Sequence, residues 1–157
     1  IAAVQGVAFG GGLQISLGAD LRLTRADAKF SVMEVKWGLV PDMAGVALLA
    51  NLVRGDVMRE LVYTGRVVDG VEAVALGLAT RVADDPLAEA RALAARIADQ
   101  SPHAVRGAKR LCNLLPDTPP ADVLLAEARE QQRLIGSPNQ VEAVHAGLAK
   151  RAPRFDD

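Results

Sequence analysis

Three consecutive glycines, Gly10, Gly11 and Gly12, separate two short apolar segments near the start of the chain. This pattern predicts a strand, a tight turn and a helix, because glycine allows positive φ angles and a close approach of a ligand to the backbone. The first N–H groups of a helix favour an anion, or an oxygen that gains negative charge in a reaction. The triplet therefore predicts an anion site, with a close-packed turn that binds nothing as the alternative.

The residues around the glycines do not fit a nucleotide site. A phosphate-binding P-loop would continue with a Lys and then a Ser or Thr, and a dinucleotide site would show G-x-G-x-x-G spacing and a longer crossover helix. Neither pattern follows Gly12. An oxyanion hole, in which backbone N–H groups stabilise a developing negative charge, is the interpretation that remains.

Two carboxylates, Glu34 and Asp42, lie eight residues apart in the segment FSVMEVKWGLVPDMAG. Apolar neighbours favour the neutral form of a carboxylic acid, so a carboxylate here could exchange a proton with a substrate. Those neighbours are Phe30, Val32, Val35, Trp37, Leu39 and Val40. The alternatives are a solvated loop acid or a partner of Lys36 for Glu34, and an N-cap of a helix from Met43 for Asp42.

Composition and charge exclude several classes of protein. With 157 residues, 50% hydrophobic and 24% charged, the chain is long enough to bury a core and has the composition of a globular domain. Its net charge of −1 provides no basic field for nucleic acid or an anionic membrane. Cys112 has no second cysteine to pair with, and His103 and His145 lack neighbours at ligand spacing, so we expect no metal and a reducing cytoplasm.

The elements that would position these residues change character along the chain. Apolar and alternating segments predict strands at 2–9, 21–24, 29–32 and 78–82, and a short helix at 13–17. Residues 33–42 contain Gly38 and Pro41, which favours an irregular connection of the kind that often carries function. Helical periodicity begins at Met43, and Asp69 is predicted to cap a helix that Gly77 ends.

The sequence predicts that the second half of the chain is helical. Four helices are predicted at 86–100, 102–115, 119–135 and 138–151, each opening at a proline, with the best linker candidate at 117–120. We therefore expect an α/β core over 1–82 and a helical region over 83–157 that belongs to the same structural unit.

The segment AVQGVAFGGGLQISLGADLRLTRADAKFSVMEVKWGLVPDMAG resembles the core signature of the crotonase superfamily, the enoyl-CoA hydratase and isomerase group. The resemblance continues through 61–65, 73–82, Lys150-Arg151 and Phe155. It implies an α/β fold in which a spiral of ββα units, here partial, carries the active site, and C-terminal helices that build trimers or hexamers. It also implies an acyl-CoA thioester substrate and no cofactor beyond that coenzyme A. A preceding segment of about 100 residues would be absent, with the first oxyanion donor in it.

The resemblance also assigns roles by position. Gly11 matches the family's second oxyanion-hole donor, and Glu34 matches its catalytic glutamate. Gln14 stands where hydratases have a second glutamate that activates water, and an amide cannot take up a proton. Asp42 matches a further acid of dienoyl-CoA isomerases.

These assignments favour an isomerase in which Glu34 moves a proton, Asp42 is a second proton relay and Gln14 orients substrate or water by hydrogen bonds. Further substrate contacts are expected at Gly10, Gly12, Trp37 and Pro41. The alternatives are an enoyl-CoA hydratase, in which Gln14 still holds the water, and a catalytically silent acyl-CoA-binding scaffold.

Overall fold

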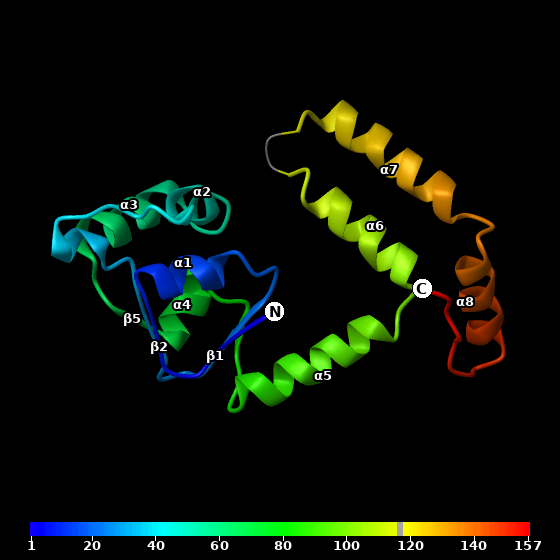
Figure 1. Ribbon diagram of the computed structural model, residues 1–157, viewed down its shortest axis with the longest axis horizontal. Helices are drawn as coiled ribbons and strands as arrows, with labels where there is room; N and C mark the ends of the chain where they lie inside the picture. The colour runs from blue at the N-terminus through cyan, green and yellow to red at the C-terminus, as the bar shows by residue number, and fades with distance from the viewer. Residues whose placement is uncertain (116–117) are drawn as a thin grey trace. The chain divides into compact units, whose positions relative to one another are not determined.

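The computed structural model describes residues 1–115 and 118–157, which fall into two compact units, Ile1–Leu93 and Ala94–Asp157 (Figure 1). The predicted linker at 117–120 begins at Asp117, which lies outside the described residues. The first unit is a mixed α/β structure and the second is helical, so the expected fold class is confirmed. The first unit contains β1 (Ala2–Val4), β2 (Val7–Phe9), α1 (Gly11–Leu17), β3 (Arg22–Thr24), β4 (Lys29–Ser31), the 3-10 helix η1 (Glu34–Trp37), α2 (Gly45–Ala50), α3 (Gly55–Thr64), β5 (Val68–Asp69), α4 (Gly70–Leu76), β6 (Arg81–Val82) and most of α5 (Pro86–Ala98).

The strands of the first unit form two small sheets. One has the strand order β1-β3-β6, all parallel, and the other has the order β2-β4-β5, in which β4 and β5 are antiparallel. The pairs β1–β2 and β3–β4 each place one strand in each sheet before the next helix, which is a ββα arrangement. The predicted single strand at 2–9 is wrong, because the chain bends at Gln5 and Gly6 and changes sheets there.

The core of the first unit lies where the helices pack on these strands. Phe30 of β4 is fully buried, and Leu13 of α1, Leu49 of α2 and Leu61 of α3 are each 1% exposed. Burial of large apolar side chains from four elements supplies the main driving force for this unit. The helical periodicity that begins near Met43 belongs to two helices, because residues 51–54 form a turn between α2 and α3.

A buried arginine closes the C-terminal end of α1. The Arg22 side chain donates hydrogen bonds to the carbonyl oxygens of Leu17, the last residue of that helix, and of Ala19 just beyond it, and to that of Leu78 at 2.8 Å. Burial lowers the pKa of Arg22. The guanidinium thus binds the carbonyl group of the last helical residue, which has no partner within the helix, and it joins α1 to the segment that leads into β6.

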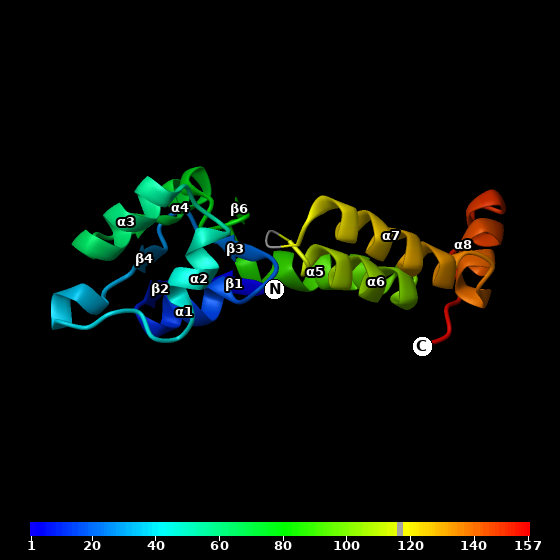
Figure 2. The same ribbon diagram turned by 90° about the horizontal axis from the view of Figure 1, so that it is seen from above.

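The second unit contains the end of α5 and three further helices, α6 (Pro102–Cys112), α7 (Pro120–Leu134) and α8 (Pro138–Leu148). In both views α7 runs alongside α6 in the opposite direction (Figures 1 and 2). The two helices are joined by Glu130, which is 9% exposed and accepts hydrogen bonds from Arg110 at 2.7 and 2.9 Å. No helix among residues 1–115 and 118–157 has both the length and the apolar character needed to cross a bilayer.

The predicted helices of this half exist but are shorter than predicted. Helix α7 starts at Pro120, with Pro119 as its N-cap, and α8 ends at Leu148 rather than at Arg151. Lys150 has a φ of 51°, which does not continue a helix, and the Arg151 side chain turns back to bind Glu142 at 2.6 and 2.9 Å. The helices predicted from sequence periodicity were too long because the residues beyond the observed ends are still compatible with a helix.

Asp69 provides a first test of the fold, since its side chain accepts a hydrogen bond from the Glu72 N–H at 2.9 Å and caps α4, as predicted. We expect Asp69→Ala to lower the free energy of unfolding by about 1 kcal/mol, because the capping acceptor is lost. Asp69→Asn keeps the acceptor and should cost much less. Urea unfolding of both variants measures the difference, and equal losses would contradict a capping role.

Glu142 provides a second test, through pH. Hydrogen bonds from the Arg151 side chain and the Arg154 N–H lower the pKa of Glu142 from 4.5 to about 2. A carboxyl with a lowered pKa in the folded state stabilises the fold fully above pH 4.5, and this contribution disappears as the pH falls toward 2. Urea unfolding between pH 6 and pH 2 should therefore depend less on pH in Glu142→Gln. Arg151→Gln should remove part of the same dependence, and an unchanged profile in both variants would rule out this pair as its source.

Candidate active site

The glycine turn lies between β2 and α1, as the sequence predicts. Gly10 has φ 52° and ψ −122°, a backbone conformation that side-chain-bearing residues rarely adopt. Its N–H donates to the Ser31 carbonyl at 3.0 Å, and its carbonyl accepts from the Gln14 N–H at 3.1 Å. The helix begins at Gly11, two residues earlier than predicted, so the Gly11 N–H has no acceptor within the helix.

Glu34 lies at the start of η1 and places its carboxylate against this turn. A Cβ atom built on Gly10 would lie 3.4 Å from Oε1 of Glu34 and 4.0 Å from Oε2. Oε1 accepts a hydrogen bond from Nε2 of Gln14 at 2.6 Å. Oε2 is buried and has no hydrogen-bond partner in the described part of the chain. Glu34 is therefore neither a solvated loop acid nor bound to Lys36, and Oε2 keeps its lone pairs for an incoming proton.

Gln14 is buried next to Glu34, outside the cavity lining, and its exposed fraction is 3%. Its Oε1 accepts hydrogen bonds from the N–H groups of Met43 at 2.8 Å and Gly45 at 2.9 Å, while its Nε2 donates to Glu34. Our expectation that Gln14 orients substrate or water directly does not fit this geometry, because its polar atoms face groups of the protein. The Gln14 side chain is instead hydrogen-bonded to the carboxylate of Glu34.

Gly45 is a site residue that the sequence analysis missed. A Cβ atom built on Gly45 would lie only 2.7 Å from Oε1 of Gln14, so glycine is needed for this contact. Ala44 before it has a φ of 64° and is the N-cap of α2, with no side-chain capping bond. The interpretation of Asp42 as N-cap is therefore wrong. A glycine at the start of a helix, rather than after its end, was the available signal.

A cavity of about 390 Å³ brings the carboxylate and the glycine turn together. Of the site residues expected from the sequence, Gly10, Gly11, Glu34, Trp37 and Asp42 line it, while Gly12, Pro41 and Gln14 do not. Its further lining residues are Phe9, Met33, Leu39 and Met43. Hollows of about 660, 620 and 590 Å³ in the second unit are larger, but among the described residues none of them contains a helix N-terminus beside an unpartnered carboxylate oxygen.

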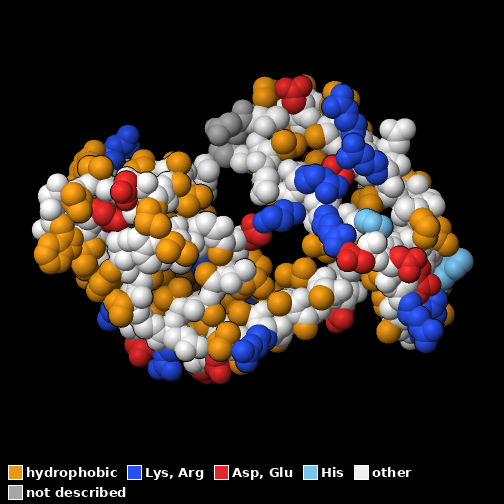
Figure 3. All heavy atoms as spheres, in the orientation of Figure 1, with side chains coloured by type: hydrophobic (Ala, Val, Ile, Leu, Met, Phe, Trp, Pro, Cys, Tyr) orange, Lys and Arg blue, Asp and Glu red, His pale blue; other side chains and the backbone are white. Residues whose placement is uncertain are grey.

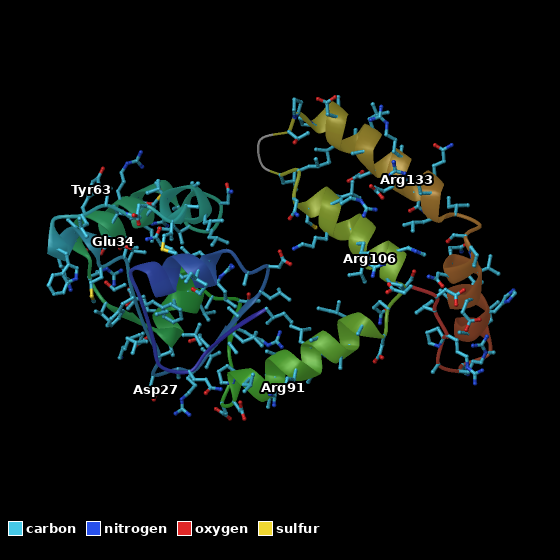
Figure 4. All side chains as sticks on the ribbon, viewed as in Figure 1. Asp27, Glu34, Tyr63, Arg91, Arg106 and Arg133 are labelled. Carbon is cyan, nitrogen blue, oxygen red and sulfur yellow. The ribbon has the colours of Figure 1, made fainter. Side chains whose placement is uncertain are left out.

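The apolar neighbours of Glu34 form an open rim rather than a closed shell. Phe30 and Val32 are buried in the core, but Trp37, Leu39 and Val40 are 76%, 63% and 74% exposed. Figure 3 shows hydrophobic side chains gathered over this end of the first unit, and Figure 4 shows Glu34 where η1 approaches the N-terminus of α1. The expected enclosure by neighbours in the sequence is wrong, because most of residues 35–40 face outward.

The two histidines give no sign of a metal centre. Among residues 1–115 and 118–157, no three His, Cys, Asp or Glu side chains are grouped so that they could hold a metal ion. The His103 ring nitrogen Nδ1 instead lies 3.1 Å from the Asn139 side-chain amide in the second unit.

Comparison with known proteins places this geometry in context. Residues 1–157 match the sequence model of the enoyl-CoA hydratase/isomerase family. The chain is 38% identical over 157 residues to a "probable enoyl-CoA hydratase" of Mycobacterium leprae, covering 99% of this chain and 61% of that protein. It is 32% identical over 161 residues to the mitochondrial methylglutaconyl-CoA hydratase of Mus musculus, covering 99% and 51%. The chain thus spans about half to three fifths of the curated relatives it matches.

Solved structures agree with the sequence comparison. An enoyl-CoA hydratase from Polaromonas sp. JS666 superposes with a TM-score of 0.93 at 29% identity, covering 99% of this chain and 61% of that one. An enoyl-CoA hydratase from Mycobacterium tuberculosis H37Rv also gives a TM-score of 0.93, at 30% identity, and covers 99% and 62%. The arrangement of strands and helices described above is therefore one that crystal structures also contain.

Gly10 tests the geometry of the turn. We expect Gly10→Ala to lower the free energy of unfolding by about 1–3 kcal/mol, because its backbone conformation is unfavourable for alanine. Gly12→Ala is the matched control, since a Cβ atom built there meets nothing within 4 Å. Thermal and urea unfolding of both variants give the comparison, and a Gly10→Ala protein as stable as the control would contradict the described turn.

Proposed function

Because the chain belongs to the enoyl-CoA hydratase/isomerase family, we propose that it carries the acid–base site of an enzyme that moves a double bond in an enoyl-CoA thioester. One observation carries the proposal. Glu34 lines the cavity that also contains Gly11, its Oε2 is buried without a hydrogen-bond partner among the described residues, and its Oε1 accepts a hydrogen bond from the amide of Gln14. The site therefore offers a proton-accepting carboxylate, that of Glu34, beside a helix N-terminus.

The first step in the proposed mechanism is removal of a proton from the carbon next to the thioester carbonyl. Breaking this C–H bond places negative charge on the carbonyl oxygen, which makes the step difficult without a hydrogen-bond donor. The Gly11 N–H is positioned at the N-terminus of α1 to donate to that oxygen. A well-placed backbone donor of this kind typically contributes about 10²- to 10³-fold in rate.

Glu34 then completes the reaction by returning the proton. Oε2 accepts the proton from C2 of a 3-enoyl thioester and gives it back at C4, so the double bond moves from C3–C4 to C2–C3. One carboxylate serves as base and then as acid, and no atom is gained or lost. Asp42, which lines the same cavity, is proposed as a second proton relay for conjugated dienoyl substrates.

The amide at position 14 supports isomerisation over hydration. Addition of water requires a positioned water molecule and commonly a second acid–base group, and Gln14 cannot take up a proton. Hydration remains the second candidate function because the curated relatives are named hydratases. In that case Glu34 alone activates the water. A catalytically silent acyl-CoA-binding scaffold is the third, and the buried unpartnered oxygen argues against it.

The surroundings of the site also support proposals about ligand and assembly. Trp37, Leu39 and Met43 are exposed around the cavity and offer apolar surface to an acyl group. Exposed apolar side chains on α7 and α8, including Leu124 and Leu148, support a homotrimer or hexamer. We propose that the protein works in the cytoplasm and needs no cofactor beyond the coenzyme A of its substrate.

Glu34→Gln tests the proposal in the whole protein that carries this chain. We expect isomerisation of 3-enoyl-CoA, and exchange of the C2 proton in deuterated water, to fall about 10²- to 10⁴-fold, because the carboxylate that removes and returns the proton is lost. Asp27→Asn, a substitution at an exposed acid that pairs with Arg25, should leave both activities unchanged. Full activity of Glu34→Gln on 3-enoyl and 3,5-dienoyl thioesters would refute the proposal.

The same assay separates the candidate functions. Isomerisation of 3-enoyl-CoA without water addition supports the isomerase, whereas hydration of 2-enoyl-CoA at a higher rate supports the hydratase. Binding of these thioesters with neither turnover nor proton exchange would support the scaffold.

A further inference from the structure

We propose that Gln14 is a positioning residue that acts through Glu34: it holds Oε1 of the carboxylate, leaves Oε2 as the oxygen that exchanges protons, and thereby favours proton return over water activation. This inference rests on the proposed function and deepens it. It concerns a side chain that lies outside the cavity lining and whose bonding the sequence alone does not show.

The orientation of the Gln14 amide follows from its partners. Two backbone N–H groups, from Met43 and Gly45, point at one end of the amide at 2.8 and 2.9 Å. That end must be the carbonyl oxygen, because an NH₂ group there would face two other donors. The NH₂ end is then the one that faces Glu34.

The contact with Glu34 makes the two carboxylate oxygens inequivalent. Nε2 of Gln14 donates to Oε1 at 2.6 Å, a short hydrogen bond to a group that carries charge when ionised. Oε2 receives no hydrogen bond within the described residues. Gly10 lies against the same carboxylate, so the group is held between an amide donor and a backbone that has no side chain. Oε2 is therefore the carboxylate oxygen that no hydrogen-bond donor of the described residues occupies.

The segment 43–45 is shaped to receive the Gln14 carbonyl. Ala44 has a φ of 64°, an unusual value for a residue other than glycine, and the N–H groups on either side of it reach the same oxygen. Gly45 leaves room for that oxygen, since an added Cβ atom would lie 2.7 Å from it. The positive φ of Ala44 and the absence of a side chain at Gly45 both favour the same contact with the Gln14 carbonyl oxygen. This indicates that the local backbone is shaped to hold the Gln14 side chain in place.

The amide also excludes a second acid–base group from this place. A glutamate at position 14 could still accept both backbone N–H groups, but its other oxygen would meet Oε1 of Glu34 with no hydrogen between them. Two carboxylates this close hold one proton between them, which supplies the second group that water addition needs. The choice of Gln rather than Glu at position 14 thus determines how many protons the site can carry.

Four variants of the whole protein test the inference, with 3-enoyl-CoA and 2-enoyl-CoA as substrates. Gln14→Met removes the three hydrogen bonds, and Gly45→Ala displaces the Gln14 carbonyl without removing any polar group. Both should lower kcat for isomerisation about 10²-fold and leave KM within about twofold, because a misplaced base slows the chemical step without weakening binding. Gly147→Ala, where an added Cβ atom meets nothing within 4 Å, is the matched control and should keep the activity.

The variant Gln14→Glu tests whether Gln14 affects the reaction as well as the fold, because a purely structural role would not change the ratio of hydration to isomerisation. We expect the ratio of hydration to isomerisation to rise at least about tenfold in this variant, because it gains a second acid–base group. Folded Gln14→Met and Gly45→Ala proteins with the kcat of the original would overturn the inference, as would an unchanged ratio in Gln14→Glu. If Gln14→Met does not fold, Gly45→Ala and Gln14→Glu carry the test, since both keep an acceptor for the N–H groups.

Failure of the proposed function has a different signature. If the original protein turns over none of the enoyl thioesters, the proposed function fails, and crystal structures of the original and of Gly45→Ala then decide the inference. A Glu34 carboxylate that leaves Gly10 in the variant supports a positioning role for Gln14, and a carboxylate that stays in place overturns it.

Discussion

The 2.6 Å hydrogen bond from Gln14 to Glu34 is the interaction on which the site depends. A half-buried carboxylate without a fixed partner would be free to turn, and an acid–base group is effective only within hydrogen-bond reach of the proton that it moves. The bond joins two residues that are twenty positions apart in the chain and lie on different elements, α1 and η1. It also sets the limit of the chemistry, because an amide can hold a carboxylate in place but cannot exchange protons with it.

The rest of the first unit supports this contact. The bend at Gln5 and Gly6 moves the chain from one sheet to the other, so that β2 pairs with β4 and brings the glycine turn beside the start of η1. Arg22 binds the carbonyl groups at the other end of α1, which fixes the helix that carries Gln14. The first N–H groups of α1 and the carboxylate thus meet in one cavity because the sheets hold their elements in register.

The site combines a rigid interior with an open apolar rim. Gln14 and the backbone of 43–45 are held by hydrogen bonds, whereas Trp37 and Val40 lie exposed on the outer side. Rigidity is needed where a proton is exchanged, since a small displacement there has a large effect on rate. Exposed apolar surface beside a cavity is suited to cover a ligand or to be covered by other protein surface.

The sequence by itself determined the features that depend on one residue or on near neighbours. These include the glycine turn at Gly10, the cap of Asp69 and the helices that open at proline, because positive φ, a capping oxygen and a fixed φ are local properties. The family resemblance also singled out Glu34. Only the tertiary structure decided that residues 2–9 form two strands, that Gln14 faces Glu34, and that position 45 must be glycine. These depend on which distant segments pack together, and neither periodicity nor spacing encodes the partner of a strand or of a buried side chain.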